Sequence, residues 1–269
     1  MKRKIWLLAL LFIMMDCQRV PITGRKQLSL VNSEKVNKMA FSSYDEVLKE
    51  SELSKNKEWT RWVKEVGHDI KDAVEKYLRE NGSSDLLEGY QWEFNLLAGD
   101  MVNAWAMPGG KVAFYEGIMP ICKTKQGVAV VMGHEVAHAI AQHGQERMSQ
   151  GVLQQVGGVA VAVATSGQSA EAQQGFMAAY GLGSQVGMML PFSRKHESEA
   201  DHMGIIFMAL AGYDPRLAPE FWKRMKAKSD GEEPNEFLST HPNHKTRIEN
   251  LNGWMPEAMK YYKKQPANK

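Results

Sequence analysis

Two histidines four residues apart, with a glutamate directly after the first, are the part of this sequence best suited to chemistry. They are His134, Glu135 and His138, in the stretch VMGHEVAHAIAQHG. On a helix, positions i and i+4 lie one turn apart on the same face, so both imidazoles can bind one metal ion. The composition of the chain gives only about 0.03 chance occurrences of this pattern. The stretch therefore predicts a metal site, with paired core histidines bonded to the backbone as the alternative.

Glu135 is expected to act differently from the two histidines. It cannot easily bind the same ion, but it borders the open coordination position, where a carboxylate can act as general base on bound water. Zinc would lower the pKa of that water to roughly 7 and polarise a substrate carbonyl, which is the chemistry that peptide hydrolysis needs. The residue types and their spacing thus predict a zinc-dependent peptidase.

A catalytic zinc ion needs a third protein ligand, and the stretch PFSRKHESEADHMG offers one. Pro191 starts a new helix there, on which Glu197 and Asp201 stand four apart on one face. Glu197 could complete a His/His/Glu site, and Asp201 could accept a hydrogen bond from a ligand histidine. The alternative is a solvated acidic helix face. His143 is nine residues after His134, on the opposite face of a continuous helix, so we expect it at the helix end near free carbonyls.

The elements that must position these residues are predicted to be mostly helical. Apolar residues repeat at helical spacing over Ser33–Glu50, opened by a Ser33 cap, and over Lys57–Glu80. Three strand-like stretches follow, YQWEFNLLA, NAWAM and KVAFYEG, and their tight turns favour an antiparallel meander. From Val128 onward the pattern is helical again. We expect one α+β domain over residues 17–269, with a small antiparallel sheet beside the helix of the histidine pair.

Two stretches between the histidine pair and Glu197 are rich in glycine and alanine. They are GVLQQVGGVAVAVATSGQ and GFMAAYGLGSQVGMML. Their shortness and polar ends argue against a bilayer span. We expect small-residue helices that pack close to the catalytic helix, with mobile parts that gate the cleft. Contact with a membrane surface is the alternative.

The N-terminus resembles a secretory signal. MKRKIWLLALLFIMMDC has three basic residues in its first four positions, an apolar run from Ile5 to Met15, and then Cys17. Because that run is shorter than the ~20 residues needed to span a bilayer, it predicts a signal peptide over residues 1–16. A cysteine after such a run resembles a bacterial lipobox, although Asp16 stands where a small residue is usual. We therefore expect Cys17 to be lipidated, which would leave Cys122 alone as a buried, unpaired thiol.

Composition and charge narrow the range of partners. The 269 residues are 43% hydrophobic and 24% charged, with a formal net charge of +2, and a chain of this size can bury a sizeable core. It has no arginine-rich run and no basic face alternating with aromatic residues. Nucleic acid is therefore not an expected partner.

Five stretches resemble peptidase family M48 in content and order. They are PITGRKQLSLV, NAWAMPGG, MGHEVAHAIAQHG, FSRKHESEADHMG and STHPNHKTRI. That family includes the HtpX heat-shock protease, the CAAX prenyl endopeptidases and the mitochondrial Oma-type protease. The resemblance runs from Pro21 to about Leu251 and looks closest to an Oma-like branch of exported bacterial lipoproteins. It implies a gluzincin-type zinc metalloprotease core.

The resemblance also implies a role for each matching residue of the metal site. His134, His138 and Glu197 would bind one zinc ion, and Glu135 would be the general base. Asp201 would be the carboxylate that supports a ligand histidine from behind.

Further residues match positions that the family uses in catalysis and substrate binding. His241 would approach the zinc site, either to stabilise the tetrahedral oxyanion or to block the fourth coordination position at rest. Arg247 would support the same charge, and such an oxyanion partner is typically worth ~3 kcal/mol of barrier. NAWAM resembles the family's edge strand, where Asn103 and Ala104 would pair with an extended substrate backbone. His244 is expected at the surface.

These observations together predict a zinc metalloendopeptidase that cleaves misfolded or unassembled cell-envelope proteins. We expect it in the periplasm, lipid-anchored to the outer membrane, with unfolded proteins and that membrane as its partners. The alternative is a chaperone-like or assembly lipoprotein that holds clients and has a non-catalytic zinc site. An intact Glu135 argues against this alternative, because a purely structural zinc site needs no base.

Overall fold

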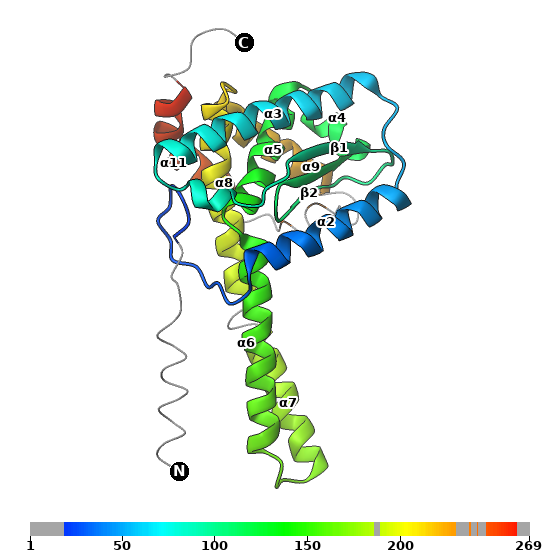
Figure 1. The fold of residues 1–269 in the computed structure, drawn as a ribbon, viewed down its shortest axis with the longest axis vertical. Helices are drawn as coiled ribbons and strands as arrows, with labels where there is room; N and C mark the ends of the chain where they lie inside the picture. The colour runs from blue at the N-terminus through cyan, green and yellow to red at the C-terminus, as the bar shows by residue number, and fades with distance from the viewer. Residues whose placement is uncertain (1–18, 186–188, 230–236, 238–240, 242–245, 263–269) are drawn as a thin grey trace.

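The computed structural model describes residues 19–185, 189–229, 237, 241 and 246–262. These residues form a body of helices around a small sheet, from which a two-helix arm extends (Figure 1). The signal peptide predicted over residues 1–16, the predicted lipidation site Cys17 and His244 lie outside the described residues.

Two long helices have the bounds that the apolar spacing predicted. They are α2, Ser33–Glu50, and α3, Lys57–Glu80. The cap of α2 is Asn32, not Ser33 as predicted: its extended backbone lets its side chain accept a hydrogen bond from the Lys35 N–H. The sheet lies between α3 and α2 in Figure 1. The two helices thus cover the sheet from opposite sides.

The sheet is mixed, so the predicted antiparallel meander is wrong in one pairing. Its strands are β1, Glu93–Leu97; β2, Ala104–Met107; and β3, Lys111–Tyr115. The order is β1-β3-β2, with β3 antiparallel to β2 and parallel to β1. Gly109 and Gly110, with φ of 79° and 91°, make the tight turn between β2 and β3. Loop 98–103 carries the chain from β1 past the end of β3 to β2. The strand-forming and turn-forming residues of the sequence do not predict this crossing.

Helices α5, Lys125–Ile140, and α8, Leu190–Leu210, cross at two glycines. A methyl group on Gly133 of α5 would lie 2.6 Å from the carbonyl oxygen of Gly204 of α8. A methyl group on Gly204 would lie 2.9 Å from the backbone nitrogen of His134. Helix α5 is buried from Gly127 to Ile140, as a helix at the centre of a fold should be. Because Gly133 and Gly204 have no side chains, the backbones of α5 and α8 come into contact there.

Shorter elements and two C-terminal helices complete the body. Helices α9, Ala218–Ser229, and α11, Arg247–Tyr262, contact each other, and α11 packs against α8. Cys122 is buried as expected, and burial raises the pKa of its thiol to about 12. The one-turn and 3-10 helices are η2, Ser84–Leu87; η3, Glu116–Ile118; α4, Met119–Cys122; and η5, Pro215–Leu217.

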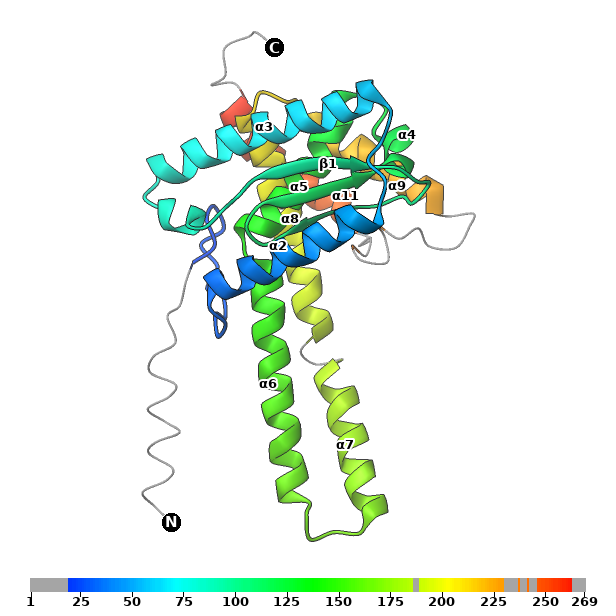
Figure 2. The ribbon, with the colours of Figure 1, turned by 45° about the vertical axis from the view of Figure 1, so that its right-hand side comes forward.

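The glycine- and alanine-rich stretches form helices α6, His143–Ala164, and α7, Ala170–Ser184. The expectation that they pack close to the catalytic helix is wrong, because beyond the root of α6 they extend away from the body (Figure 2). We call residues 151–184 the arm. Its helices pack on each other instead, where Gly157 leaves room for Tyr180. Within the described residues, no helix has the length and apolar character needed to cross a membrane.

We expect Gly133→Ala to push α5 and α8 apart, because its methyl group would meet the Gly204 carbonyl at 2.6 Å. Overpacking of this kind typically lowers the free energy of unfolding by about 1–3 kcal/mol. Metal binding should also weaken, since His134 and Glu197 sit on the separated helices. Urea unfolding with and without metal measures both effects. Gly151→Ala is the matched control, because nothing lies within 4 Å of its added methyl group; equal losses in both variants would contradict the prediction.

Candidate active site

Four buried side chains from α5, α8 and the segment before α11 converge on one point. His134, His138, Glu197 and His241 each offer a ligand atom, and these atoms all lie within 4.8 Å of one another. The Nε2 atoms of the two α5 histidines are 3.1 Å apart. They lie 3.4 and 3.3 Å from carboxylate oxygens of Glu197. Imidazole nitrogens with one carboxylate are a donor set that suits a tetrahedral divalent metal ion.

Asp201 and Arg247 hold the first ligand histidine and the ligand carboxylate from behind. Asp201 Oδ1 lies 3.0 Å from His134 Nδ1, which leaves His134 Nε2 facing the ligand group. Arg247 donates from Nε to Asp201 at 2.6 Å and from Nη2 to Glu197 at 3.0 Å. Its guanidinium lies 3.7 Å from the ring centre of Trp222. Arg247 therefore positions the two carboxylates, while its predicted support of an oxyanion stays a prediction.

His143 lies beside the site, which corrects its expected place on the opposite face. Helix α5 ends at Ile140, and Gln142 has a left-handed backbone with φ 52°. The rotation per residue of a continuous helix does not apply across that break. His143 Nδ1 lies 2.8 Å from His138 Nδ1, and His143 Nε2 lies 3.0 Å from Glu199. If His143 donates to Glu199, its Nδ1 accepts from His138, whose Nε2 lone pair then faces the ligand group.

A ring of polar and charged side chains continues from His143 to the N-terminal segment. Arg25 binds Glu199 at 2.8 Å and Glu146 at 2.8 Å. Glu146 in turn lies 2.9 Å from His196 Nε2, and the His196 and His143 rings stack with centres 4.2 Å apart. Apart from His143, these residues were not predicted from the sequence. One pattern in the sequence could have indicated them. A histidine is followed three residues later by a glutamate, once on α6 and once on α8.

Glu135, the predicted general base, lies beside His241 of the ligand group. It is buried, and its carboxylate accepts a hydrogen bond from the backbone N–H of Ala106 in β2. Among the described residues its Oε1 has no hydrogen-bond partner, and that atom lies 3.6 Å from His241 Nε2. His241 is held by Phe237, whose carbonyl accepts from its N–H at 2.8 Å and whose ring stacks on it. An unpartnered buried carboxylate oxygen beside these ligand atoms fits a site that holds a metal ion and a water molecule.

Burial and neighbouring charges shift the pKa values of the site in opposite directions. Burial would lower the pKa of His134, but hydrogen bonds to Asp201 and Glu197 outweigh it and raise that pKa to about 9. Burial lowers the pKa of His138 to about 4 and raises the pKa of Glu135 to about 8. Burial would also raise the pKa of Glu197, but His138 and His134 hold it well below its usual value. A neutral His138 and a charged Glu197 are the protonation states that bind metal.

Strand β2 is an edge of the sheet, but the two residues predicted to bind substrate are not equally placed. The carbonyl of Asn103 already accepts from Tyr115 of β3. The side chain of Asn103 accepts from the N–H of Ala104. From the register with β3, the outward backbone groups of β2 belong to Ala104 and Ala106. The N–H of Ala106 is bound to Glu135 and that of Ala104 to the side chain of Asn103, so the unused edge consists of the carbonyls of Ala104 and Ala106, next to Glu135.

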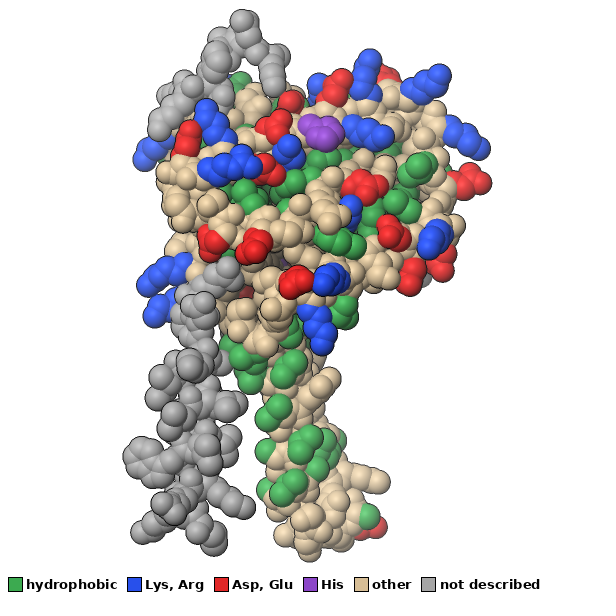
Figure 3. Space-filling model, viewed as in Figure 1, with side chains coloured by type: hydrophobic (Ala, Val, Ile, Leu, Met, Phe, Trp, Pro, Cys, Tyr) green, Lys and Arg blue, Asp and Glu red, His purple; other side chains and the backbone are tan. Residues whose placement is uncertain are grey.

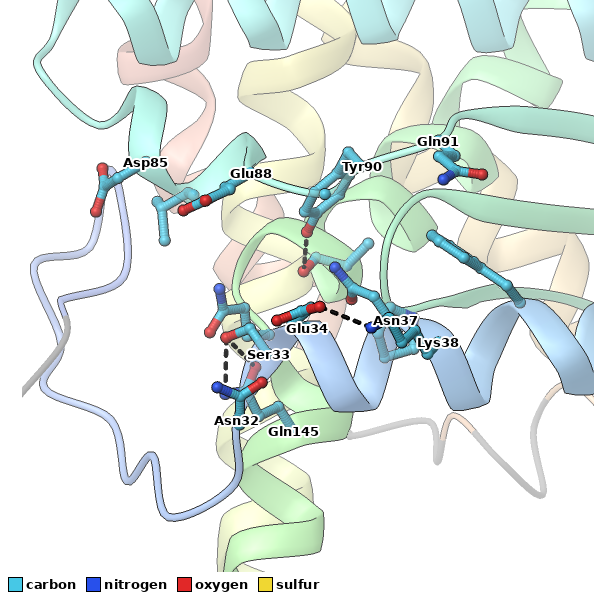
Figure 4. A pocket seen from close by; sticks show the side chains of 16 residues that line it. Asn32, Ser33, Glu34, Asn37, Lys38, Asp85, Glu88, Tyr90, Gln91 and Gln145 are labelled. Carbon is cyan, nitrogen blue, oxygen red and sulfur yellow. Dashed lines mark hydrogen bonds and ion pairs between the residues drawn. The ribbon is translucent and has the colours of Figure 1, made fainter.

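A separate pocket lies near the C-terminal end of α5 (Figure 4). Its volume is about 680 Å³. The lining residues come from the start of α2, the loop around Tyr90, and the α5–α6 junction. Tyr90 closes one side by donating to the Ala139 carbonyl at 2.8 Å. None of the lining residues belongs to the metal-ligand group, so the pocket is distinct from the metal site.

Comparison with known proteins gives consistent matches. A family model described as "Peptidase family M48" matches residues 65–255. The "Mitochondrial metalloendopeptidase OMA1" of Schizosaccharomyces pombe is 35% identical over 246 residues, which are 89% of this chain and 66% of that protein. The human "Metalloendopeptidase OMA1, mitochondrial" is 26% identical over 262 residues, 94% of this chain and 49% of that protein. The "Beta-barrel assembly-enhancing protease" of Escherichia coli is 29% identical over 168 residues, 58% of this chain and 33% of that protein.

These matches bear on two of the expectations. The chain spans between a third and two thirds of the length of the relatives named above. The expected location, in the periplasm at the outer membrane, is wrong, because the relatives that cover most of this chain are mitochondrial proteins. Lipidation of Cys17 falls outside the described residues and stays a prediction.

We expect His143→Ala to lower the affinity of the protein for Zn²⁺ by about 10- to 100-fold, because His138 loses the group that orients it. Competition with a chelating dye measures the dissociation constant, and urea unfolding tests whether the fold is kept. His143→Gln, which retains an acceptor, should recover part of the affinity. The control is His202→Ala, which removes a histidine of α8 bound to Glu257 at 2.8 Å. Unchanged Zn²⁺ affinity in folded His143→Ala would contradict the assignment.

Proposed function

Because the chain belongs to peptidase family M48, we propose that it is a zinc-dependent endopeptidase that cuts misfolded or unassembled proteins. The observation that carries the proposal is the position of Glu135. Its buried carboxylate lies 3.6 Å from Nε2 of His241, which belongs to the same ligand group as His134, His138 and Glu197, and it accepts a hydrogen bond from the edge strand β2. A site that only held a metal ion for stability would have no use for such a base.

The residues around Glu135 suit the hydrolysis of a peptide bond. His134, His138 and Glu197 would hold Zn²⁺, which when bound would supply a Lewis acid for the substrate carbonyl and lower the pKa of water. Glu135 takes the proton of the attacking water and passes it to the leaving amine nitrogen. Burial raises the pKa of Glu135 to about 8, which makes its carboxylate a stronger base than an exposed glutamate. His241 Nε2, 3.6 Å from Glu135, donates to the oxyanion of the tetrahedral intermediate.

The surroundings of the site favour extended substrates. Glu135, His134 and Glu197 are 2–3% exposed, so a folded protein cannot bring a peptide bond to them. An extended segment can enter along β2 and donate its backbone N–H groups to the outward carbonyls of Ala104 and Ala106. Backbone pairing tolerates many side chains but requires an unfolded stretch. This supports misfolded or unassembled chains as the substrate class.

We expect Glu135→Gln to reduce the cleavage of casein by Zn²⁺-loaded protein about 100-fold or more, because the general base is lost. Zinc content, measured by atomic absorption, should stay the same, since Glu135 is not a ligand. A chelator should stop cleavage by the parent protein, and added Zn²⁺ should restore it. Equal cleavage by both proteins would contradict the proposed role of Glu135.

If the parent protein does not cut casein, there are two explanations, and a second variant distinguishes between them. His241 can occupy the fourth coordination position at rest, in which case His241→Ala cuts where the parent does not. If neither protein cuts while both bind Zn²⁺ and casein, the site holds clients without hydrolysing them, and the peptidase proposal fails.

Pairing of substrate with β2 has its own test, which needs no protein variant. Successive backbone amides of a cleaved peptide are N-methylated one at a time, and kcat/KM is measured for each peptide. Only alternate amides of a strand face its partner. We therefore expect kcat/KM to fall about fivefold or more at every second position, the cost of one hydrogen bond. A uniform loss, or none, would show that substrate does not bind as a strand.

A further inference from the structure

The arm has a composition unlike that of the body. Between Arg147 and Arg194 the sequence has a single charged residue, Glu171, whereas 24% of the whole chain is charged. Figure 3 shows the contrast on one face: acidic and basic side chains gather on the body, and hydrophobic or uncharged ones cover the arm. A solvated helical hairpin normally carries charges along its outer faces.

One face of α6 exposes a continuous apolar stripe. Val152, Val156, Val159 and Val163 are between 40% and 68% exposed, and their spacing of four, three and four residues places them on one side of the helix. Other exposed hydrophobic side chains on the arm are Leu153, Phe176, Met177 and Leu182. The arm thus carries more than half of the large hydrophobic side chains that the described residues expose. Large apolar surface of this kind marks an interaction site.

The opposite face of α6 is closed by α7. A methyl group on Gly157 would lie 2.0 Å from the Tyr180 hydroxyl, so the helices meet across a small residue. The hydroxyl of Tyr180 donates to the Gln154 carbonyl at 2.9 Å, and the Gln154 amide donates to Ser184 at 2.8 Å. Close approach at small residues, with polar groups satisfied between the helices, is how helix pairs are built for an apolar environment. The polar groups therefore pair inside the hairpin, while the valine stripe faces out.

Basic side chains surround the root of the arm, where its apolar surface begins. Arg147 on α6 and Arg194 and Lys195 on α8 are exposed. They lie at one level, because their neighbours Glu146 and His196 are 2.9 Å apart. Basic residues at the border of an apolar segment are placed to meet lipid phosphates. We call these three residues the basic collar.

The N-terminal segment reaches the body at the same root. The N–H of Leu28 donates to Glu146 at 3.2 Å, and that of Leu30 donates to Ser149 at 3.0 Å. The sequence before this segment contains the apolar run from Ile5 to Met15.

We propose that the arm binds a lipid membrane. Its valine stripe lies at the boundary between headgroups and acyl chains, and the basic collar contacts lipid phosphates. Since no described helix suits a full crossing, the hairpin lies in the interface and does not span the bilayer. A second copy or an unfolded client is a less suitable occupant, because neither explains why basic residues border an otherwise almost uncharged surface.

The test is hydrogen–deuterium exchange of the full chain with and without phosphatidylcholine vesicles. Exchange is read within residues 151–184, because the N-terminal run alone can hold the protein on vesicles. We expect vesicles to slow exchange in the arm and to leave α2 unchanged. Val156→Glu combined with Val159→Glu should weaken this protection about tenfold or more. Both valines are more than 60% exposed, so the fold should stay intact, which the melting temperature checks.

A matched control and a second lipid composition sharpen the test. Met39→Glu on α2, where the side chain is 54% exposed, should leave protection of the arm unchanged. Phosphatidylglycerol in the vesicles should strengthen binding, and Arg194→Gln with Lys195→Gln should remove only that gain. Unchanged exchange of the arm with vesicles overturns the proposal. So does protection that rises with protein concentration alone, which assigns the stripe to a second copy, or protection that needs unfolded casein.

Discussion

The glycine crossing of α5 and α8 is the constraint on which the site depends. The histidine pair is on α5, whereas Glu197 and Asp201 are on α8, so the ligand set forms only if the two backbones meet. Gly133 and Gly204 permit that contact, since a methyl group on either would lie within 3 Å of the facing backbone. Arg247 then locks the α8 carboxylates through two hydrogen bonds. The two glycines thus set the distances between the ligand atoms. The buried guanidinium of Arg247 keeps the like-charged carboxylates of Glu197 and Asp201 together.

A second set of contacts supports His138 of the candidate metal site. It is the ring of His143, Glu199, Arg25 and Glu146. These groups, all buried except the partly exposed Arg25, satisfy one another in sequence, which is the condition under which a buried polar network stabilises a fold. Arg25 contacts both acidic residues at 2.8 Å and so ties the N-terminal segment to α6 and α8. The orientation of His138 consequently depends in part on Arg25, more than a hundred positions away in the chain. A ligand histidine fixed in this way loses little freedom when it binds metal.

The sequence predicted features that depend on spacing within one element, and failed where separate elements meet. The pair on α5, the carboxylates on α8 and the bounds of α2 and α3 follow from helical periodicity alone. His143 was misplaced because the left-handed backbone of Gln142 ends the helix on which the angle was counted. The parallel pairing of β1 with β3 was missed because turn residues specify hairpins, not crossings. The contacts of Arg247 and the direction of the arm depend on long-range packing, which a single sequence with no alignment does not reveal.

The break at Gln142 links the site to the arm. It turns the chain so that the first residue of α6, His143, lies against His138, and it sends the rest of α6 away from the body. The early turns of α6 are held by the N-terminal segment through Glu146 and Ser149, before the arm begins. The ring of contacts around His143 therefore lies between the arm and the histidine pair on α5. If the arm binds a membrane as proposed, this ring separates the attached hairpin from the candidate metal site, whose ligand geometry is fixed within the body.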